Sequence, residues 1–184
     1  AIDALTKKQL DQFSASHIID AILVGGLVGL GGAGFPTHLK YTNLNQQFLP
    51  KIHTLIINGA ECEPYITCDE QLMLDYADDL IDGSLLLMKA AGVQQAIFAI
   101  EDQVGGIKSQ LQQKLKKRKI EDIKVVKVPT IYPAGGEKQL IKVLTGLEVP
   151  SGGLPLDLGM IVQNVGTIKA LADFVKLGNP LVER

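Results

Sequence analysis

The chain has 184 residues, about the length of one domain, and its hydrophobic (46%) and charged (21%) fractions exclude a disordered chain or a fibrous repeat. The 18 Lys and Arg against 20 Asp and Glu leave a formal charge of −2. This balance provides no basic field for gripping a phosphate backbone, so nucleic acid is not expected as a partner.

The N-terminus and the apolar segments predict a chain that stays in the cytoplasm. Residues 1–16 are polar, unlike a signal peptide, and the most apolar stretch, 21–35, is shorter than the roughly 20 residues of a membrane-spanning helix. Cys62 and Cys68 form neither a CxxC pair nor a disulfide framework, which fits a reducing compartment. No direct membrane span is expected.

Apolar periodicity and turn signals predict helices that alternate with short strands. In chain order we expect a helix over 17–24 capped by Ser16, a strand at 55–57, a helix over 75–91, a strand at 96–100, a helix over 106–117, a strand at 123–128, a helix over 137–144, a strand at 160–162 and a helix over 167–177. This order predicts an α/β fold: an open, mainly parallel sheet covered by helices on both faces, as in a Rossmann-like sandwich. Residues 1–15 are expected to be a lead-in, and 16–184 a single α/β domain.

Ligands of open α/β sheets bind beyond the carboxyl ends of the strands. The segments that leave the predicted strands are 58–69, 101–106, 129–138 and 163–167, and most of them are rich in Gly, Pro, Asn and Glu. We therefore expect the functional residues in these segments.

A glycine-rich loop spans 25–34, and its residues 29–34 match the G-x-G-x-x-G pattern. The dinucleotide fingerprint requires a preceding strand and an acid about 20 residues later, but here a helix precedes and no acid occurs between Asp20 and Glu61. An ordinary Rossmann NAD site is therefore not expected. Bare backbone N–H groups with Lys40 nearby suit an anionic cofactor, and the alternative is a tight turn with close helix packing.

The segment 58–64 (NGAECEP) carries two carboxylates, Glu61 and Glu63, at positions i and i+2. In extended backbone both side chains point to one side. They suit the ribose hydroxyls or ring nitrogens of a nucleotide, and the alternative is a solvated acidic loop.

Other residue types give weaker signals. No nucleophile motif or Walker A sequence occurs, and the two cysteines and His17, His38 and His53 lack metal-ligand spacing. We therefore expect neither a catalytic side chain nor a metal site. The basic cluster at 114–119 is interpreted as a solvated helix end, with a docking patch for an acidic protein as the alternative.

Five motifs in order, at 29–40 (GLGGAGFPTHLK), 58–69 (NGAECEPYITCD), 132–140 (YPAGGEKQL), 150–155 (PSGGLP) and 163–167 (QNVGT), resemble the RnfC subunit of Rnf electron transport complexes. The resemblance runs from about residue 16 to the end of the chain. The same motifs are more distantly similar to the flavin-carrying, NADH-oxidising subunit of respiratory complex I.

The resemblance implies a domain in which FMN lies in a cleft of an α/β sandwich and NADH stacks over it. By motif position it assigns Gly29, Gly31, Gly32, Lys40, Asn58 and Glu61 to the flavin, Phe35 to the nicotinamide, Glu63 and Glu137 to the NADH site, and Tyr132, Gly135, Asn164 and Thr167 to the remaining flavin shell. Ala60 and Gly136 stand where complex I has acids, which implies weaker flavin binding.

By the same resemblance, the chain is the central domain of a larger subunit, whose iron–sulfur clusters lie in a C-terminal region that this chain lacks. The implied function is hydride transfer between NAD(H) and FMN, with onward electron transfer in an ion-translocating complex. The implied partners are NADH and other subunits, with a cytoplasmic location peripheral to the inner membrane. A cobalamin reductase flavin domain and a non-catalytic scaffold subunit of the same fold are the alternatives.

Overall fold

The computed structural model describes residues 3–42, 44, 50–61, 66–102, 105–129 and 136–182. Its centre is a four-stranded sheet in the order β3-β2-β1-β4, in which all three pairings are parallel. The strands are β1 (Thr54–Gly59), β2 (Ala96–Glu101), β3 (Ile123–Val128) and β4 (Met160–Asn164). The predicted open parallel sheet is confirmed.

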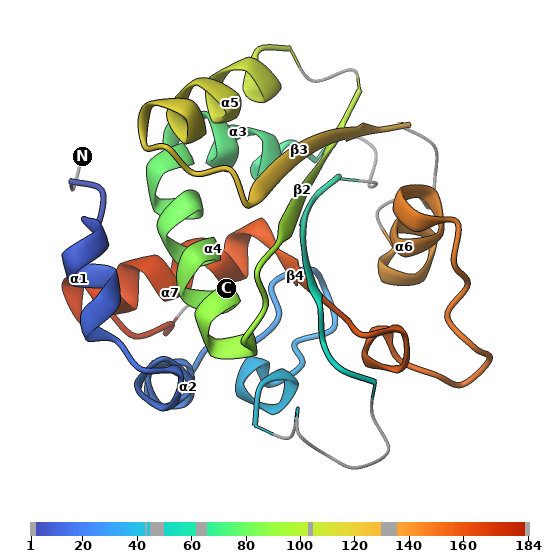
Figure 1. Cartoon of the computed structure of the whole chain (residues 1–184), viewed down its shortest axis with the longest axis horizontal. Coiled ribbons are helices and arrows are strands. Elements are labelled where there is room, and N and C mark those ends of the chain that lie inside the picture. The colour runs from blue at the N-terminus through green and yellow to red at the C-terminus, as the bar shows by residue number, and fades with distance from the viewer. Residues whose placement is uncertain are drawn as a thin grey trace.

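Helices cover the two faces of the sheet unequally. They are α1 (Lys7–Gln12), α2 (Ala15–Val24), α3 (Cys68–Asp75), α4 (Ala77–Ala91), α5 (Ile107–Lys117), α6 (Glu137–Thr145) and α7 (Val165–Leu177), with the 3₁₀ helices η1 (Thr37–Lys40) and η2 (Pro155–Leu158). Figure 1 shows α3, α4, α5 and α7 on one side of the sheet and α6 on the other.

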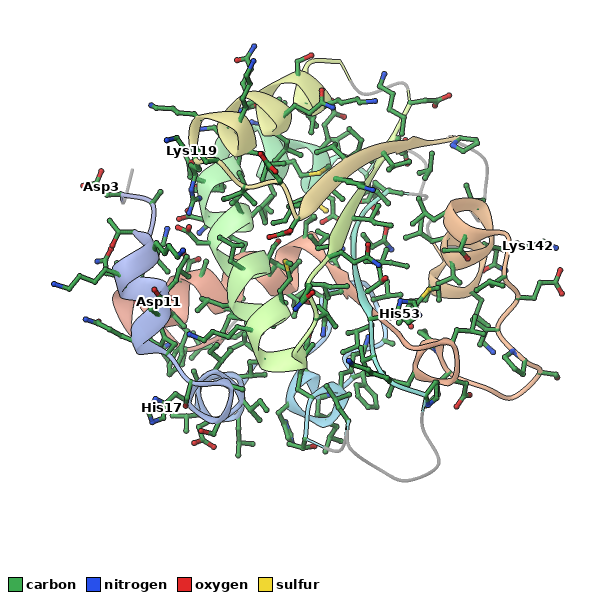
Figure 2. All side chains as sticks on the ribbon, in the orientation of Figure 1. Asp3, Asp11, His17, His53, Lys119 and Lys142 are labelled. Carbon is green, nitrogen blue, oxygen red and sulfur yellow. The ribbon has the colours of Figure 1, made fainter. Side chains whose placement is uncertain are left out.

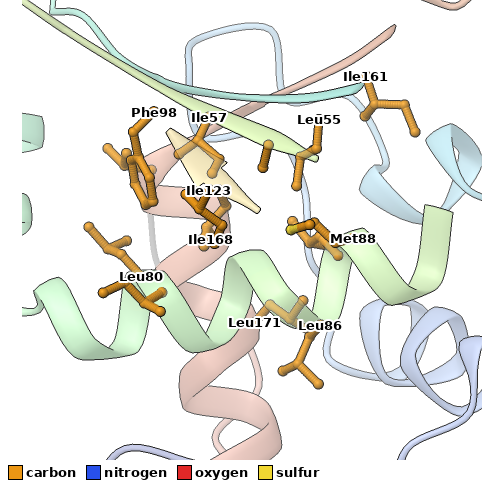
Figure 3. Packing of buried hydrophobic residues seen from close by; sticks show 14 of the residues in the cluster. Leu55, Ile57, Leu80, Leu86, Met88, Phe98, Ile123, Ile161, Ile168 and Leu171 are labelled. Carbon is orange, nitrogen blue, oxygen red and sulfur yellow. The ribbon is translucent and has the colours of Figure 1, made fainter. Parts of the chain in front are cut away.

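Alternating strand residues build the two cores, because successive side chains point to opposite faces. Leu55 and Ile57 of β1 join the larger core, where they pack with residues of α4 and α7 (Figure 3). Ile56, between them, joins the smaller core, with Leu140 and Ile141 of α6. Strand β1 is thus buried on both faces, as the centre of a parallel sheet requires.

The helix boundaries differ from the sequence expectations in several places. Ser14, not Ser16, caps α2, because its hydroxyl accepts a hydrogen bond from the His17 amide (3.1 Å). The helix expected over 75–91 corresponds to α4, which begins at Ala77, and the preceding helix α3 (Cys68–Asp75) was not expected. Helix α7 begins two residues earlier than expected, because Asn164 provides its cap.

Asp82 of α4 is completely buried and connects the segment around Leu5 with helices α4, α5 and α7. Its carboxylate accepts hydrogen bonds from the Leu5 amide (2.9 Å) and Arg118 (2.5 Å), and Lys176 lies 2.6 Å away. A buried charge is tolerated only when it is paired and hydrogen-bonded in this way. Residues before 16 are therefore anchored to α4, α5 and α7.

The basic cluster at the end of α5 divides into two groups. Lys114 pairs with Asp78 and Arg118 with Asp82, so these two cations hold helices together. Lys116, Lys117 and Lys119 are exposed, and Figure 2 shows Lys119 at the periphery of the molecule. The solvated-face interpretation therefore describes only part of the cluster.

Within the described residues, none of the helices has both the length and the apolar character needed to cross a bilayer.

Gly83 marks the closest approach of α4 to α7 and provides a test of this packing. A Cβ at this position would lie 2.5 Å from the Ile168 carbonyl oxygen. Gly83→Ala is expected to lower the free energy of unfolding by about 1–3 kcal/mol, although alanine is the better helix former. The measurement is urea unfolding followed by circular dichroism. The control is Gly105→Ala, where a Cβ meets no described atom within 4 Å, and equal effects of the two substitutions would contradict the packing.

Candidate functional site

The candidate site lies where the chain reverses its direction across the sheet. From β1 the chain moves outward to β2 and β3, and then returns through α6 to β4 on the other side of β1. The segments that leave β1 and β4 therefore diverge, which is where open α/β sheets bind ligands. Asn58 and Asn164 are register partners at the ends of these two strands.

A cavity of about 140 Å³ occupies this position. It is lined by the glycine loop, η1, the ends of β1 and β4 and the start of α6, through Gly29, Gly31, Ala33, Phe35, Lys40, Asn58, Gly136, Glu137, Val162, Gln163 and Asn164. Segments far apart in the sequence thus meet at one point.

The glycine loop lies directly against the first turn of α7. Its ends are joined by a bridge between Val28 and Pro36, and Gly32 has φ +107°, a conformation that glycine adopts without strain. The Leu30 amide donates to the Thr167 hydroxyl (3.0 Å). A Cβ on Gly31 would lie only 3.3 Å from the Asn164 Cβ. Small residues are therefore needed for this close approach.

Lys40 is held across the cavity by partners from two elements. Its ammonium donates to Glu137 Oε1 (2.9 Å) at the start of α6 and to the Val162 carbonyl (2.8 Å) on β4. The Lys40 side chain is 22% exposed and that of Glu137 46%. Lys40 thus lines the same cavity as the glycine loop, with its charge partnered by Glu137.

Asn164 connects α7 to the loop after β1. Its Oδ1 accepts a hydrogen bond from the Gly166 amide (2.7 Å) and caps α7, while its Nδ2 donates to Asp69 Oδ2 (2.6 Å). Burial raises the pKa of Asp69 to about 6, against the opposing effect of the Asn164 hydrogen bond, and the nearby Glu61 carboxylate raises it further. Asp69 therefore titrates close to neutral pH.

The segment after β1 contributes further polar contacts. Asn58 Oδ1 accepts from the Ala60 amide (3.1 Å), and Glu61 Oε2 accepts from the Cys68 thiol (3.2 Å). Partial burial and the Glu61 carboxylate raise the pKa of Cys68, so the thiol stays protonated and unreactive at neutral pH.

Gln163 has an unsatisfied donor at the cavity. Its side chain is 2% exposed, and its Nε2 forms no hydrogen bond of normal geometry with the described residues. The buried Tyr41 hydroxyl also lacks a partner of normal geometry. Burial raises the pKa of Tyr41, and a hydrogen bond from the Gln163 side chain opposes this rise. The Tyr41 hydroxyl is thus a nearby acceptor for the Gln163 amide, although the two groups are poorly aligned.

A second, largely apolar hollow of about 320 Å³ adjoins the cavity. The two share Ala33, Phe35, Lys40, Glu137 and Val162, so the Lys40–Glu137 ion pair borders both. The hollow extends over η2, and the Phe35 ring on its wall is 45% exposed. An exposed ring beside an apolar hollow is suited to stacking against a planar group.

The structure brings most of the predicted residues to one place. Gly29, Gly31, Phe35, Lys40, Asn58, Glu137 and Asn164 line the cavity. Gly32 lies at the exposed tip of the loop, and Glu61 and Thr167 bind neighbouring residues. Glu63, Tyr132 and Gly135 lie outside the described residues.

Two residues of the site were not predicted from the sequence. Gln163 lies within the motif 163–167, and its position at the end of a strand was the available signal. Asp69 closes the motif 58–69, but only the fold places it beside Asn164. The Val162 carbonyl that binds Lys40 is main chain and carries no side-chain signal.

Known flavin and nucleotide proteins share this architecture. Residues 22–173 match the family model described as the Nuo51 FMN-binding domain. The fold is similar to a chain of the NAD⁺-reducing [NiFe]-hydrogenase (TM-score 0.78, 25% identity), with 98% of this chain and 36% of that chain covered.

Relatives of similar sequence belong to ion-translocating enzymes. The chain is 42% identical to the C subunit of the proton-translocating ferredoxin:NAD⁺ oxidoreductase complex of Clostridium ljungdahlii, over 97% of this chain and 38% of the relative. It is 44% identical to the C subunit of the ion-translocating oxidoreductase complex of Pseudomonas aeruginosa, over 91% of this chain and 21% of the relative. The resemblance to RnfC is thus confirmed, and the chain spans well under half the length of these relatives.

Thr167 provides a test of how the glycine loop is held. In Thr167→Val the Leu30 amide loses its acceptor, so the free energy of unfolding is expected to fall by about 1–3 kcal/mol. The loop should also become more sensitive to limited proteolysis. Thr167→Ser keeps the hydroxyl and serves as the control. If valine and serine behave alike, the hydroxyl does not hold the loop.

The raised pKa of Asp69 implies that the stability of the folded chain depends on pH. Because its pKa is higher in the folded chain (about 6) than its ordinary value of 3.8, the folded state binds the proton more tightly. This contribution to stability is fully present below about pH 4 and is lost as the pH rises through about 6. Asp69→Asn is therefore expected to be more stable than the wild type by about 1–3 kcal/mol at pH 7.5, with the difference vanishing near pH 4. Thermal unfolding measured across this range checks the sign, and a constant difference would contradict it.

Proposed function

The chain belongs to the Nuo51 FMN-binding domain family, and from that premise we propose that it binds FMN between β1 and β4 and passes hydride from NADH to the flavin. The observation that carries the proposal is the convergence at one cavity of the glycine loop, Lys40 and the strand-end residues Asn58 and Asn164.

The residues at this cavity fit an anionic, oxygen-bearing cofactor. Glycine-loop main chain admits a ligand without Cβ interference, and Lys40 offers a positive charge to a phosphate. Gln163 also lines this cavity, with its amide near the Tyr41 hydroxyl. Asn58 and Asn164, at the ends of the two strands, would orient the same group from either side.

The adjoining hollow would take the nicotinamide nucleotide. Phe35 provides a flat apolar surface there, and Glu137, at the border of both hollows, can accept hydrogen bonds from ribose hydroxyls. The bound flavin supplies the redox chemistry, because it accepts hydride directly from the nicotinamide. The chain's own task is to align the two rings and exclude water, which requires no catalytic nucleophile.

The role in a larger assembly is also a proposal. The names of the relatives describe subunits of ion-translocating oxidoreductase complexes. By analogy, this domain would serve a membrane-associated complex from its cytoplasmic side, together with other subunits. Iron–sulfur clusters outside this chain would then carry the electrons onward.

The first test is direct binding of FMN to the purified chain. We expect quenched flavin fluorescence and a shifted visible spectrum. Lys40→Met should weaken binding about tenfold or more, which is about 1.4 kcal/mol, because it removes the cation beside the glycine loop. The matched control is Lys51→Met, an exposed lysine that precedes β1 at the opposite end of the strands. Equal affinities of the two variants would contradict the placement of the phosphate.

The second test is reduction. Anaerobic addition of NADH to the FMN-loaded chain should bleach the flavin band, and ferricyanide should then restore it. FMN binding without bleaching would restrict the function to a flavin carrier. Absence of both binding and bleaching would favour the non-catalytic scaffold.

A further inference from the structure

We propose that Asp69 is a positioning residue of this site, whose carboxylate fixes the orientation of the Asn164 side-chain amide and through it the contact between α7 and the glycine loop. This inference rests on the proposed function, because it names the group that keeps the cofactor cavity in shape.

The hydrogen-bond chemistry of Asp69 determines how the Asn164 amide is turned. An amide has a donor end and an acceptor end, and both orientations occupy the same space. An ionised carboxylate only accepts, so Asp69 draws the amide nitrogen of Asn164 to itself (2.6 Å). The amide oxygen must then face the Gly166 amide (2.7 Å), which is the arrangement that caps α7. Asp69 therefore reinforces the orientation of the Asn164 amide that the Gly166 amide also favours.

The selected orientation matters because the glycine loop lies on the same turn of α7. A Cβ on Gly31 would contact Asn164 Cβ at 3.3 Å, and a Cβ on Gly166 would meet Leu30 side-chain atoms at 3.4 Å. The Leu30 amide binds Thr167 in this turn. Rotation of the Asn164 amide would leave the Gly166 amide facing an N–H group, so the turn against the loop would have to move.

The surroundings of Asp69 make this orientation depend on its charge. The terminal atoms of Glu61, Cys68 and Asp69 lie within 4.8 Å of one another, and no cation forms an ion pair with Asp69 among the described residues. Burial, with the Glu61 charge, raises the pKa of Asp69 to about 6. When protonated, the carboxyl gains an O–H that can donate, and it no longer selects the amide orientation.

The test compares the dissociation constants of FMN for the wild type and two variants at pH 5 and pH 7.5. Asp69→Asn replaces the acceptor-only group by an amide of similar shape, so it should bind FMN about five-fold more weakly than the wild type at pH 7.5 and equally at pH 5. Asp69→Leu should bind about tenfold more weakly than the wild type at pH 7.5 and should stay weaker at pH 5, because it has no acceptor at all. The ratio to the wild type cancels titration of the FMN phosphate.

The control is Asp75, an exposed acid at the other end of α3 whose partner, Gln71, lies on the same helix (2.9 Å). Asp75→Asn should match the wild type at both pH values. A readout in the FMN-free chain is the side-chain amide resonance of Asn164, which should titrate near pH 6 in the wild type and stay constant in Asp69→Asn.

The outcomes separate the two proposals. If the wild type binds no FMN at either pH, the proposed function fails and this inference falls with it. If FMN binds but Asp69→Asn equals the wild type at pH 7.5, or is weaker by the same factor at both pH values, the positioning role is overturned while the proposed function stands. An Asn164 resonance that does not titrate in the wild type also overturns it.

Discussion

The return of the chain from β3 to β4 is the constraint on which the site depends. Because β4 pairs with β1 and not with β3, the loops that follow β1 and β4 leave neighbouring strand ends in different directions. Helix α6, which is part of this return, lies on the face of the sheet opposite to α4 and α7 (Figure 1). Its first residue, Glu137, forms a hydrogen bond with Lys40. The connection from β3 through α6 to β4 thus creates the crevice and also places Glu137 at its border.

The site also depends on close contact between the main chain of the glycine loop and the first turn of α7. The glycine loop lies close against the first turn of α7, where Gly31 and Gly166 add no side-chain bulk and Thr167 accepts a hydrogen bond from the Leu30 amide. A loop built in this way offers N–H groups and little side-chain bulk to a ligand. The charge that an anionic ligand needs comes instead from Lys40, which reaches the site from a separate 3₁₀ helix.

The parts of the fold that were predictable from sequence are those with local signals. The four strands are short β-branched or apolar runs bounded by turn residues, and α5 and α6 show clear helical periodicity, so both kinds of element were found. Helices α1 and α3 were missed because their sequences are largely polar and show little apolar periodicity. At the site, residue types in motifs indicated Lys40 and Asn164, whereas their partners, the Val162 carbonyl and Asp69, follow only from tertiary placement.

Two carboxyl groups in the helical layer, those of Asp82 and Asp69, differ in how completely their charges are paired. Asp82 is completely buried, and it is satisfied by a backbone amide, Arg118 and Lys176. Asp69, partly buried, has the Asn164 amide and a neighbouring acid, Glu61, so its ionised form is disfavoured. The carboxyl that stabilises the fold is thus fully paired, whereas the one beside the end of β4 keeps a neighbour of like charge.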